Sequence, residues 1–170
     1  MKLILSDRPL PLPDLGPEVR FVDLSALRIA PCTGCFGCWT RTPGRCVIRD
    51  DATAVYPLIA RSEAVFYISR LCYGGYDTPM KTMLERAIPV QQAFIRLLHG
   101  ETHHVQRSVA MKRVTILGYG DISPAEQEIF RRLVGRNAAN MNFAGYRVLF
   151  AREADLEQTV QREVTAWLAS

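Results

Sequence analysis

Residues 64–68 have the sequence Ala-Val-Phe-Tyr-Ile, a continuous run of apolar, β-branched and aromatic side chains. A run of this kind, without polar alternation, is typical of a strand that is covered on both faces. Two further strands are predicted later in the chain, at Arg113–Leu117 and Tyr146–Phe150. We therefore expect a parallel sheet with other elements packed against both of its sides.

Two more strands are predicted near the N-terminus, at Lys2–Ser6 and Val19–Leu24. In the second of them, Val19, Phe21 and Val22 are expected to face the interior. The sheet should therefore contain five strands.

Helices are predicted between and after the later strands. Ser123-Pro124-Ala125-Glu126 is a capping box with proline at the first helical position, and it predicts a helix to about Arg136. Pro57 is expected to kink the helix that contains it or to cost it a hydrogen bond. The other helices carry apolar residues at helical spacing: Ala52, Val55, Leu58 and Ile59; Met80, Met83, Leu84 and Ala87; Leu156, Val160, Val164, Trp167 and Leu168. Strands that alternate with helices indicate a doubly wound parallel α/β sheet, which binds ligands at the carboxyl ends of its strands.

The connection between the first two strands departs from this alternation. Asp7–Pro17 contains four prolines, which remove backbone donors and exclude a helix. About ten residues of polyproline-like chain reach roughly 30 Å, more than the ~17 Å needed to return alongside a five-residue strand. We expect a parallel crossover whose helix is missing.

Composition limits the class of protein. The 170 residues are 48% hydrophobic, enough for one domain with a core, so we expect residues 1–170 to form a single domain. The apolar run in Met1–Leu5 is too short for a signal peptide or a membrane span. Five cysteines without such a signal favour the cytoplasm. The net charge of +4 is spread along the chain, which argues against nucleic acid as a partner.

Four cysteines lie close together in a loop that spans residues 31–49. A C-x₂-C-x₂-C run joined by a further cysteine is one of the usual cradles of a [4Fe–4S] cluster. Glycines between the ligands let the backbone curl tightly. A zinc site, disulfides and a loop of free thiols remain alternatives. The candidate metal ligands are Cys32, Cys35, Cys38 and Cys46.

Two loops at the predicted carboxyl ends of strands are rich in glycine and tyrosine. Glycine lets a planar ring approach the backbone, and tyrosine provides a flat surface for stacking. Ordinary turn chemistry would explain either loop alone. The candidate cofactor-binding residues here are Tyr73, Gly74, Gly75, Tyr76, Asp77, Gly118, Tyr119 and Gly120; no catalytic residue is assigned.

Other reactive or aromatic residues have simpler interpretations. Cys72 is expected to be a small buried residue, and Trp39 to shield the cysteine loop from solvent. His99, His103 and His104 lie in a segment to which no structure is assigned. They could form a metal site or could be exposed loop residues.

Five segments carry a resemblance to a known family, namely Pro31–Trp39, Pro43–Ile48, Asp50–Asp51, Tyr73–Gly75 and Met80–Arg86. In these segments the chain resembles the iron–sulfur flavoproteins, in the NADPH-dependent FMN reductase branch of the flavodoxin-like proteins. The resemblance covers about residues 29–86. It implies FMN at the carboxyl edge of the sheet, a [4Fe–4S] cluster on the cysteine loop, electron transfer and a dimeric or tetrameric assembly.

The first loop departs from the family pattern. Members of the family bind the FMN phosphate with backbone N–H groups of a loop and helix, whereas this chain has prolines there. Ser6 and Arg8 could hold an anion with their side chains, and Asp7 would repel it.

Three functions therefore remain open. The first is an electron-transfer oxidoreductase of the iron–sulfur flavoprotein type, with a small-molecule or protein redox partner. The second is an NAD(P)H-dependent flavin or quinone reductase without a cluster. The third is a flavodoxin-like interaction module without a cofactor.

The missing helix also bears on assembly. A parallel sheet is seldom left facing water, so an uncovered apolar face indicates an interface. We expect a homodimer or a larger assembly that buries Leu10, Leu12 and Leu15, or residues of Ile88–Leu98.

Overall fold

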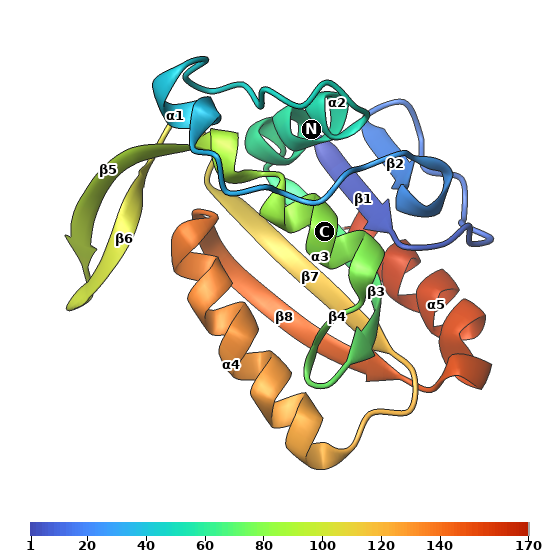
Figure 1. Ribbon diagram of the computed structural model, residues 1–170. Helices are drawn as coiled ribbons and strands as arrows, with labels where there is room; N and C mark the ends of the chain where they lie inside the picture. The colour runs from blue at the N-terminus through green and yellow to red at the C-terminus, as the bar shows by residue number, and fades with distance from the viewer. Residues whose placement is uncertain (170) are drawn as a thin grey trace.

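A five-stranded parallel sheet forms the centre of the computed structural model, which describes residues 1–169 (Figure 1). The strand order is β2-β1-β3-β7-β8, the order of a flavodoxin-like sheet. The doubly wound fold predicted from the sequence is confirmed. The strands are β1 (Lys2–Ser6), β2 (Val19–Asp23), β3 (Ala64–Cys72), β7 (Lys112–Tyr119) and β8 (Phe143–Ala151), and the short β4 (Gly75–Tyr76) pairs antiparallel with the end of β3.

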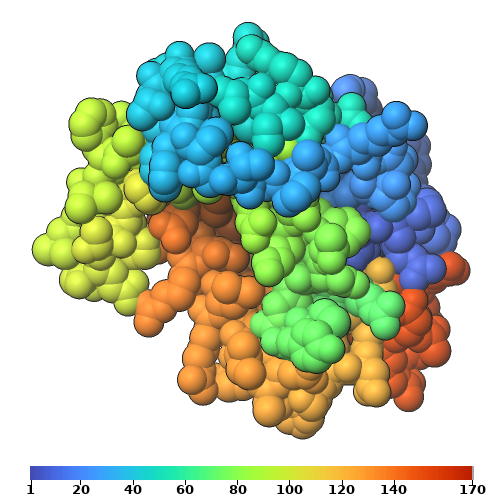
Figure 2. Space-filling view, viewed as in Figure 1, coloured from blue at the N-terminus to red at the C-terminus, as the bar shows by residue number. Residues whose placement is uncertain are grey.

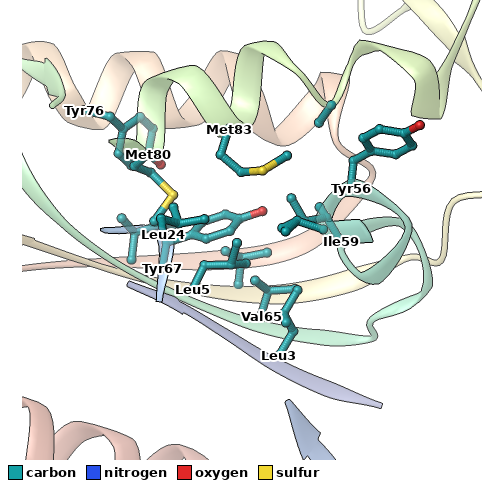
Figure 3. Close-up of a cluster of buried hydrophobic side chains, with 14 of the residues drawn as sticks. Leu3, Leu5, Leu24, Tyr56, Ile59, Val65, Tyr67, Tyr76, Met80 and Met83 are labelled. Atoms are coloured by element: carbon teal, nitrogen blue, oxygen red, sulfur yellow. The ribbon is translucent and has the colours of Figure 1, made fainter. Parts of the chain in front are cut away.

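Helices cover both faces of this sheet. Successive side chains of a strand point to opposite faces, so Leu3 and Leu5 join one core and Ile4 joins the other. On the first face, α2 (Ala52–Arg61), α3 (Thr78–Glu85) and α4 (Pro124–Asn140) pack over Val65 and Tyr67, as Figure 3 shows in part. On the second face lies α5 (Leu156–Leu168). No helix within residues 1–169 is long and apolar enough to cross a membrane.

Short helical turns complete the chain. They are η1 (Leu24–Ala26), α1 (Gly37–Thr40), η2 (Ile88–Val90) and η3 (Glu153–Asp155). The capping box at Ser123 forms as expected, because its hydroxyl accepts from the Glu126 N–H and the Glu126 carboxylate accepts from the Ser123 N–H. Pro57 lies inside α2 without ending it.

The first crossover contains no helix between residues 7 and 18, which confirms that prediction. Instead, Leu10, Leu12 and Leu15 pack against the core that α5 covers. The expectation that Phe21 faces the interior is wrong, because this side chain is 36% exposed. Phe21 pairs with Ile4 on the face that the missing helix would cover.

The segment without an assigned structure forms a separate two-stranded hairpin, β5 (Gln91–Leu98) and β6 (Glu101–Gln106). Its turn residues His99 and Gly100 both have positive φ, +52° and +79°, as a tight hairpin turn requires. The hairpin projects from the body of the molecule (yellow-green in Figures 1 and 2).

Candidate functional site

The cysteine loop lies at the amino end of the sheet. Its Gly44 adjoins Arg107, and a small cleft there is also lined by Ala60 and Val109, which come shortly before β3 and β7. In Figure 1 the turn α1 is therefore far from the loop between β3 and β4. The candidate metal ligands and the candidate cofactor-binding residues of the β3–β4 loop therefore lie at opposite ends of the strands.

A buried arginine joins the two ends of the cysteine loop. The Arg86 side chain has no exposed surface, and its guanidinium donates to both carboxylate oxygens of Asp50 at 2.7 and 2.8 Å. It also donates to the carbonyls of Ala30 (2.6 Å) and Ile48 (3.3 Å), which flank the four cysteines in the sequence. A bidentate pair of this kind fixes geometry as well as charge.

The ion pair between Arg86 and Asp50 keeps both side chains charged. Burial by itself would raise the pKa of Asp50, but the bonds from Arg86 and from the Ala30 N–H hold this pKa below its ordinary value. Burial by itself would lower the pKa of Arg86, yet Asp50 and a hydrogen bond to the Cys46 side chain raise it. Both groups are thus charged at neutral pH.

The four cysteines differ in exposure. Cys32 and Cys35 are exposed, Cys38 is half-buried and Cys46 is buried. The Gly37 N–H and then the Thr33 hydroxyl bond to Cys35 and lower the pKa of its thiol. Burial and then the neighbouring cysteines, Cys46 first, raise the pKa of Cys38. The Cys38 thiol therefore lies within electrostatic reach of the other three loop cysteines.

One glycine of the loop is required by packing. A Cβ on Gly37 would lie 2.7 Å from Cγ1 of Val47 and 3.5 Å from the Cys35 sulfur. The helical turn that carries Cys38 can therefore lie against Val47 only because residue 37 has no side chain.

The cysteine loop offers sulfur donors to a metal centre. Four thiols in one loop are the donor set of a [4Fe–4S] or zinc centre. Within residues 1–169, however, no three or more cysteine, histidine or acidic side chains are arranged to hold a metal ion. The donor chemistry of the four thiols fits a cluster.

Trp39 joins the cysteine loop to the hairpin. Its indole N–H donates to the Gln91 carbonyl at 3.1 Å, and its ring lies 4.7 Å from that of His104 and 5.5 Å from that of Phe36. His103 is buried between Asn140 (3.0 Å) and Glu101 (3.1 Å). Two of the three histidines thus have structural contacts, and His99 is exposed in the hairpin turn.

At the other end of the strands, β3 and β4 are joined by a two-residue turn. Tyr73 and Gly74 have φ of +52° and +73°, and Tyr73 is 90% exposed. A Cβ on Gly74 would lie 2.7 Å from Cγ2 of Ile129, so the turn packs closely against α4. Hairpin geometry explains this glycine without a ligand.

A groove of about 760 Å³ runs beside this turn, between α3 and α4. Four of the predicted residues line it, namely Tyr73, Gly75, Tyr76 and Asp77. Figure 2 shows the molecule hollowed between α3 (green) and α4 (orange). Sequence reasoning missed Lys81, Leu133 and Asn137 on its walls, because these residues belong to ordinary amphipathic helices.

The groove adjoins a smaller cavity of about 180 Å³, with Tyr76, Leu84 and Asn137 common to both. This cavity extends to His104 and Gln91, the residues that Trp39 contacts. The hydroxyl of Tyr67, another lining residue, is buried without a hydrogen-bond partner among residues 1–169. The walls therefore combine tyrosine rings with amide groups, a suitable surface for a planar molecule.

The loop after β7 does not line the groove. A Cβ on Gly118 would lie 2.5 Å from Cδ1 of Leu71, so the space that this glycine leaves is filled from β3. Tyr119 is 4% exposed. Gly120, at φ +125°, is buried in the turn that follows. Packing accounts for Gly118 and Tyr119, and the positive φ of the turn accounts for Gly120.

Side chains of this protein occupy the space after the end of β1. Ser6 is fully buried, and its hydroxyl accepts from the Arg8 N–H at 3.3 Å. Arg8 pairs with Glu153 at 2.5 Å and lies over the ring of Tyr119. Burial raises the pKa of Asp7, although the Arg70 N–H, Tyr119 and Ser69 oppose that effect. The structure does not bring Ser6 and Arg8 together with the groove.

The expectation that Cys72 is buried is wrong. Cys72 is exposed at the last position of β3, where this strand pairs with the short β4 at the surface. It lines the groove, at the opposite end of the strands from the other four cysteines.

Comparison with curated proteins confirms the resemblance to iron–sulfur flavoproteins. The chain is 37% identical over 78 residues to an iron–sulfur flavoprotein of Archaeoglobus fulgidus, covering 46% of this chain and 34% of that protein. It is 27% identical over 79 residues to an iron–sulfur flavoprotein of Methanocaldococcus jannaschii, covering 46% of this chain and 40% of that protein. The matched part thus spans well under half of each relative. No family model matches the chain.

Solved structures confirm the fold. The azoreductase AzrA superposes with a TM-score of 0.61 at 10% identity, covering 98% of this chain and 94% of that one. An NAD(P)H:quinone oxidoreductase from Methanothermobacter marburgensis gives a TM-score of 0.58 at 13% identity, covering 89% and 85%. These likenesses concern architecture alone.

Proposed function

We propose that this protein is an electron-transfer oxidoreductase of the iron–sulfur flavoprotein type, with a [4Fe–4S] cluster on Cys32, Cys35, Cys38 and Cys46. The observation that carries the proposal is the loop itself, which places four thiols between two ends that Arg86 holds together. A bound cluster supplies one-electron transfer, and the protein supplies position and electrostatics.

Flavin is the second redox group of the proposal, supported by the names of the two relatives. The groove between α3 and α4 supports the ring, since Tyr73 and Tyr76 offer aromatic surface and Lys81 a positive charge. The residues after β1 do not fit the phosphate of FMN. A nicotinamide donor and a small-molecule or protein acceptor belong to the same proposal.

Anaerobic purification tests the cluster directly. We expect about four iron atoms and four sulfides per chain, and a broad visible absorption from thiolate-bound iron that bleaches on reduction. The variant in which the four loop cysteines are serine should lose the iron and the absorption. The variant Cys72→Ser should keep both, because this exposed cysteine lies at the other end of the strands. Stoichiometric zinc, or no metal after reconstitution with iron and sulfide, would contradict the proposal.

The buried closure after β1 favours a second candidate, an interaction module without a cofactor. Asp7, Arg8 and Tyr119 satisfy one another there without any ligand. A reductase without a cluster is distinguished from both, because it would retain flavin and nicotinamide oxidation after the four loop cysteines are changed to serine.

We also propose a homodimer or tetramer, with the hairpin as the contact. Leu10, Leu12 and Leu15 are partly buried within the chain, whereas Phe94, Ile95 and Leu97 are 72%, 64% and 78% exposed. Apolar side chains grouped in this way mark interfaces.

Light scattering at micromolar concentration should give at least twice the mass of one chain. The double variant Phe94→Ser/Leu97→Ser should shift the mass toward the monomer. Ile129→Ser, which changes an exposed residue of α4, should not. A monomeric wild type removes the proposal.

The cytoplasm is the proposed location, since all five cysteines are free thiols.

A further inference from the structure

We propose that the carboxylate of Asp7 occupies the anion position at the carboxyl end of the sheet, so that this edge gives no binding advantage to a phosphorylated ligand. For flavins, the inference rests on the proposed function and deepens it, because it predicts that a flavin binds without help from its phosphate. For simple anions, it stands on the contacts of Asp7 alone.

The first step is the set of donors that meet at Asp7. Its Oδ2 accepts from the Arg70 N–H at 2.6 Å and from the Ser69 hydroxyl at 3.3 Å. Its Oδ1 accepts from the Tyr119 hydroxyl at 2.8 Å. These donors come from the ends of β3 and β7, the next two strands on one side of β1 in the sheet. A backbone N–H and two hydroxyls are the groups that would otherwise bind the oxygens of a phosphate.

The second step is the burial of this carboxylate. Asp7 is 8% exposed, and its own N–H donates to the Ile68 carbonyl at 3.2 Å, which continues the pairing of β1 with β3. The carboxylate is therefore held by backbone on one side and by three donors on the other. An anion from solvent could bind these donors only by displacing it.

The third step concerns the charged groups and backbone donors that surround the Asp7 carboxylate. Arg8, the nearest cation in sequence, is already paired with Glu153 at 2.5 Å. Pro9 has no N–H, and no helix begins between residues 7 and 18, so the usual helix N-terminus for a phosphate is absent there. The carboxylate of Asp77 is close enough to raise the pKa of Asp7, after the larger effect of burial. An incoming phosphate would face two negative charges.

These steps give a ligand preference. If the flavin ring binds in the groove, its phosphate gains nothing from the residues after β1. Riboflavin and FMN should then bind the wild-type protein with dissociation constants within about threefold of each other, since a phosphate that stays in solvent contributes little.

The first experiment uses the wild-type protein. Titration with riboflavin and with FMN at matched ionic strength, followed by flavin fluorescence, should give similar affinities. A preference for FMN of about tenfold or more would overturn the inference, because it would require a phosphate site. If neither flavin binds, the proposed flavin function fails, and the anion experiment decides the inference alone.

The anion experiment uses Asp7→Ala, which removes the carboxylate and leaves its donors. Formate, acetate or inorganic phosphate should raise the melting temperature of this variant above that in sodium chloride of equal ionic strength, because ligands of the native state stabilise it. Wild type and Asp7→Asn, whose side chain still fills the position, should show no such difference. Should Asp7→Ala fail to fold, Asp7→Ser replaces it, since the shorter serine side chain leaves the positions of the carboxylate oxygens open.

An unchanged melting temperature of the folded alanine or serine variant in all three anions would overturn the inference. A rise of the wild type in phosphate alone would do so as well, since a free phosphate site would then exist elsewhere on this edge. If flavins bind the alanine variant, its affinity for FMN relative to riboflavin should be higher than that of the wild type.

Discussion

The variant Arg86→Met is expected to lose about 3–5 kcal/mol of unfolding free energy, the usual result of removing one partner from a buried ion pair. Methionine keeps most of the apolar contacts of the arginine stem. It cannot donate to Asp50 or to the carbonyls of Ala30 and Ile48, which Arg86 now satisfies. The half-buried Asp50 carboxylate would be left without its cation.

Urea unfolding of the metal-free protein measures this loss. The matched control is Arg132→Met, which breaks an exposed i,i+4 pair with Glu128 and should cost at most about 0.5 kcal/mol. The double variant Arg86→Met/Asp50→Asn should be less destabilised than the sum of the single variants, because the second change removes the unpaired charge. Equal losses of unfolding free energy in Arg86→Met and Arg132→Met would contradict the role of Arg86 in holding the two ends of the cysteine loop together.

The same variant should expose the cysteine loop. Cys46 is buried and hydrogen-bonds the Arg86 side chain, so its thiol should react slowly in the wild type. In Arg86→Met, reaction with a thiol reagent under native conditions should show one additional fast cysteine. Arg86→Lys should give an intermediate result, since an ammonium keeps the charge but lacks the bidentate geometry.

Much of the fold could be predicted because its signals are local. Apolar runs marked all five parallel strands, and the capping box at Ser123 marked the start of α4. Prolines after Ser6 excluded the first helix. The hairpin β5–β6 was missed because neither Gln91–Leu98 nor Glu101–Gln106 shows a regular alternation of apolar and polar residues, and His99-Gly100 is not a common turn signal.

The candidate site was only partly predictable, because its contacts join residues far apart in the sequence. The clustering of four cysteines is visible in the sequence itself. The pair Arg86–Asp50 and the bond from Tyr119 to Asp7 span 36 and 112 positions, and no local pattern indicates them. Likewise, the glycine at 118 suggested an open approach for a ring, whereas Leu71 from the neighbouring strand fills the space.

Lys112 provides the other large expected effect, and its cause is desolvation. This side chain is 1% exposed, and its ammonium donates only to the Ala110 carbonyl, at 2.6 Å, among the contacts of residues 1–169. Burial lowers the pKa of Lys112 to about 8, from 10.5. At neutral pH the folded protein therefore holds a poorly solvated charge, at a cost on the order of 3 kcal/mol relative to the unfolded chain.

The sign of the pH dependence follows from this shift. Between the folded value of about 8 and the unfolded value of 10.5, the unfolded state binds more protons than the folded state. Stability from this group therefore rises as the pH increases through that interval, and its cost is fully present below pH 8. Lys112→Met should be more stable than the wild type at pH 7.5, and this advantage should shrink by about 2 kcal/mol at pH 9.5.

Urea unfolding of both proteins at the two pH values measures the change, and all other titrating groups cancel in the difference. Lys81→Met, which removes an exposed ammonium, should give a difference from wild type that hardly varies with pH. A pH-independent difference for Lys112→Met would mean that Lys112 keeps its ordinary pKa in the folded protein. Since this lysine lies at the amino end of β7, far from the groove, the substitution should raise stability and leave the binding of flavin unchanged.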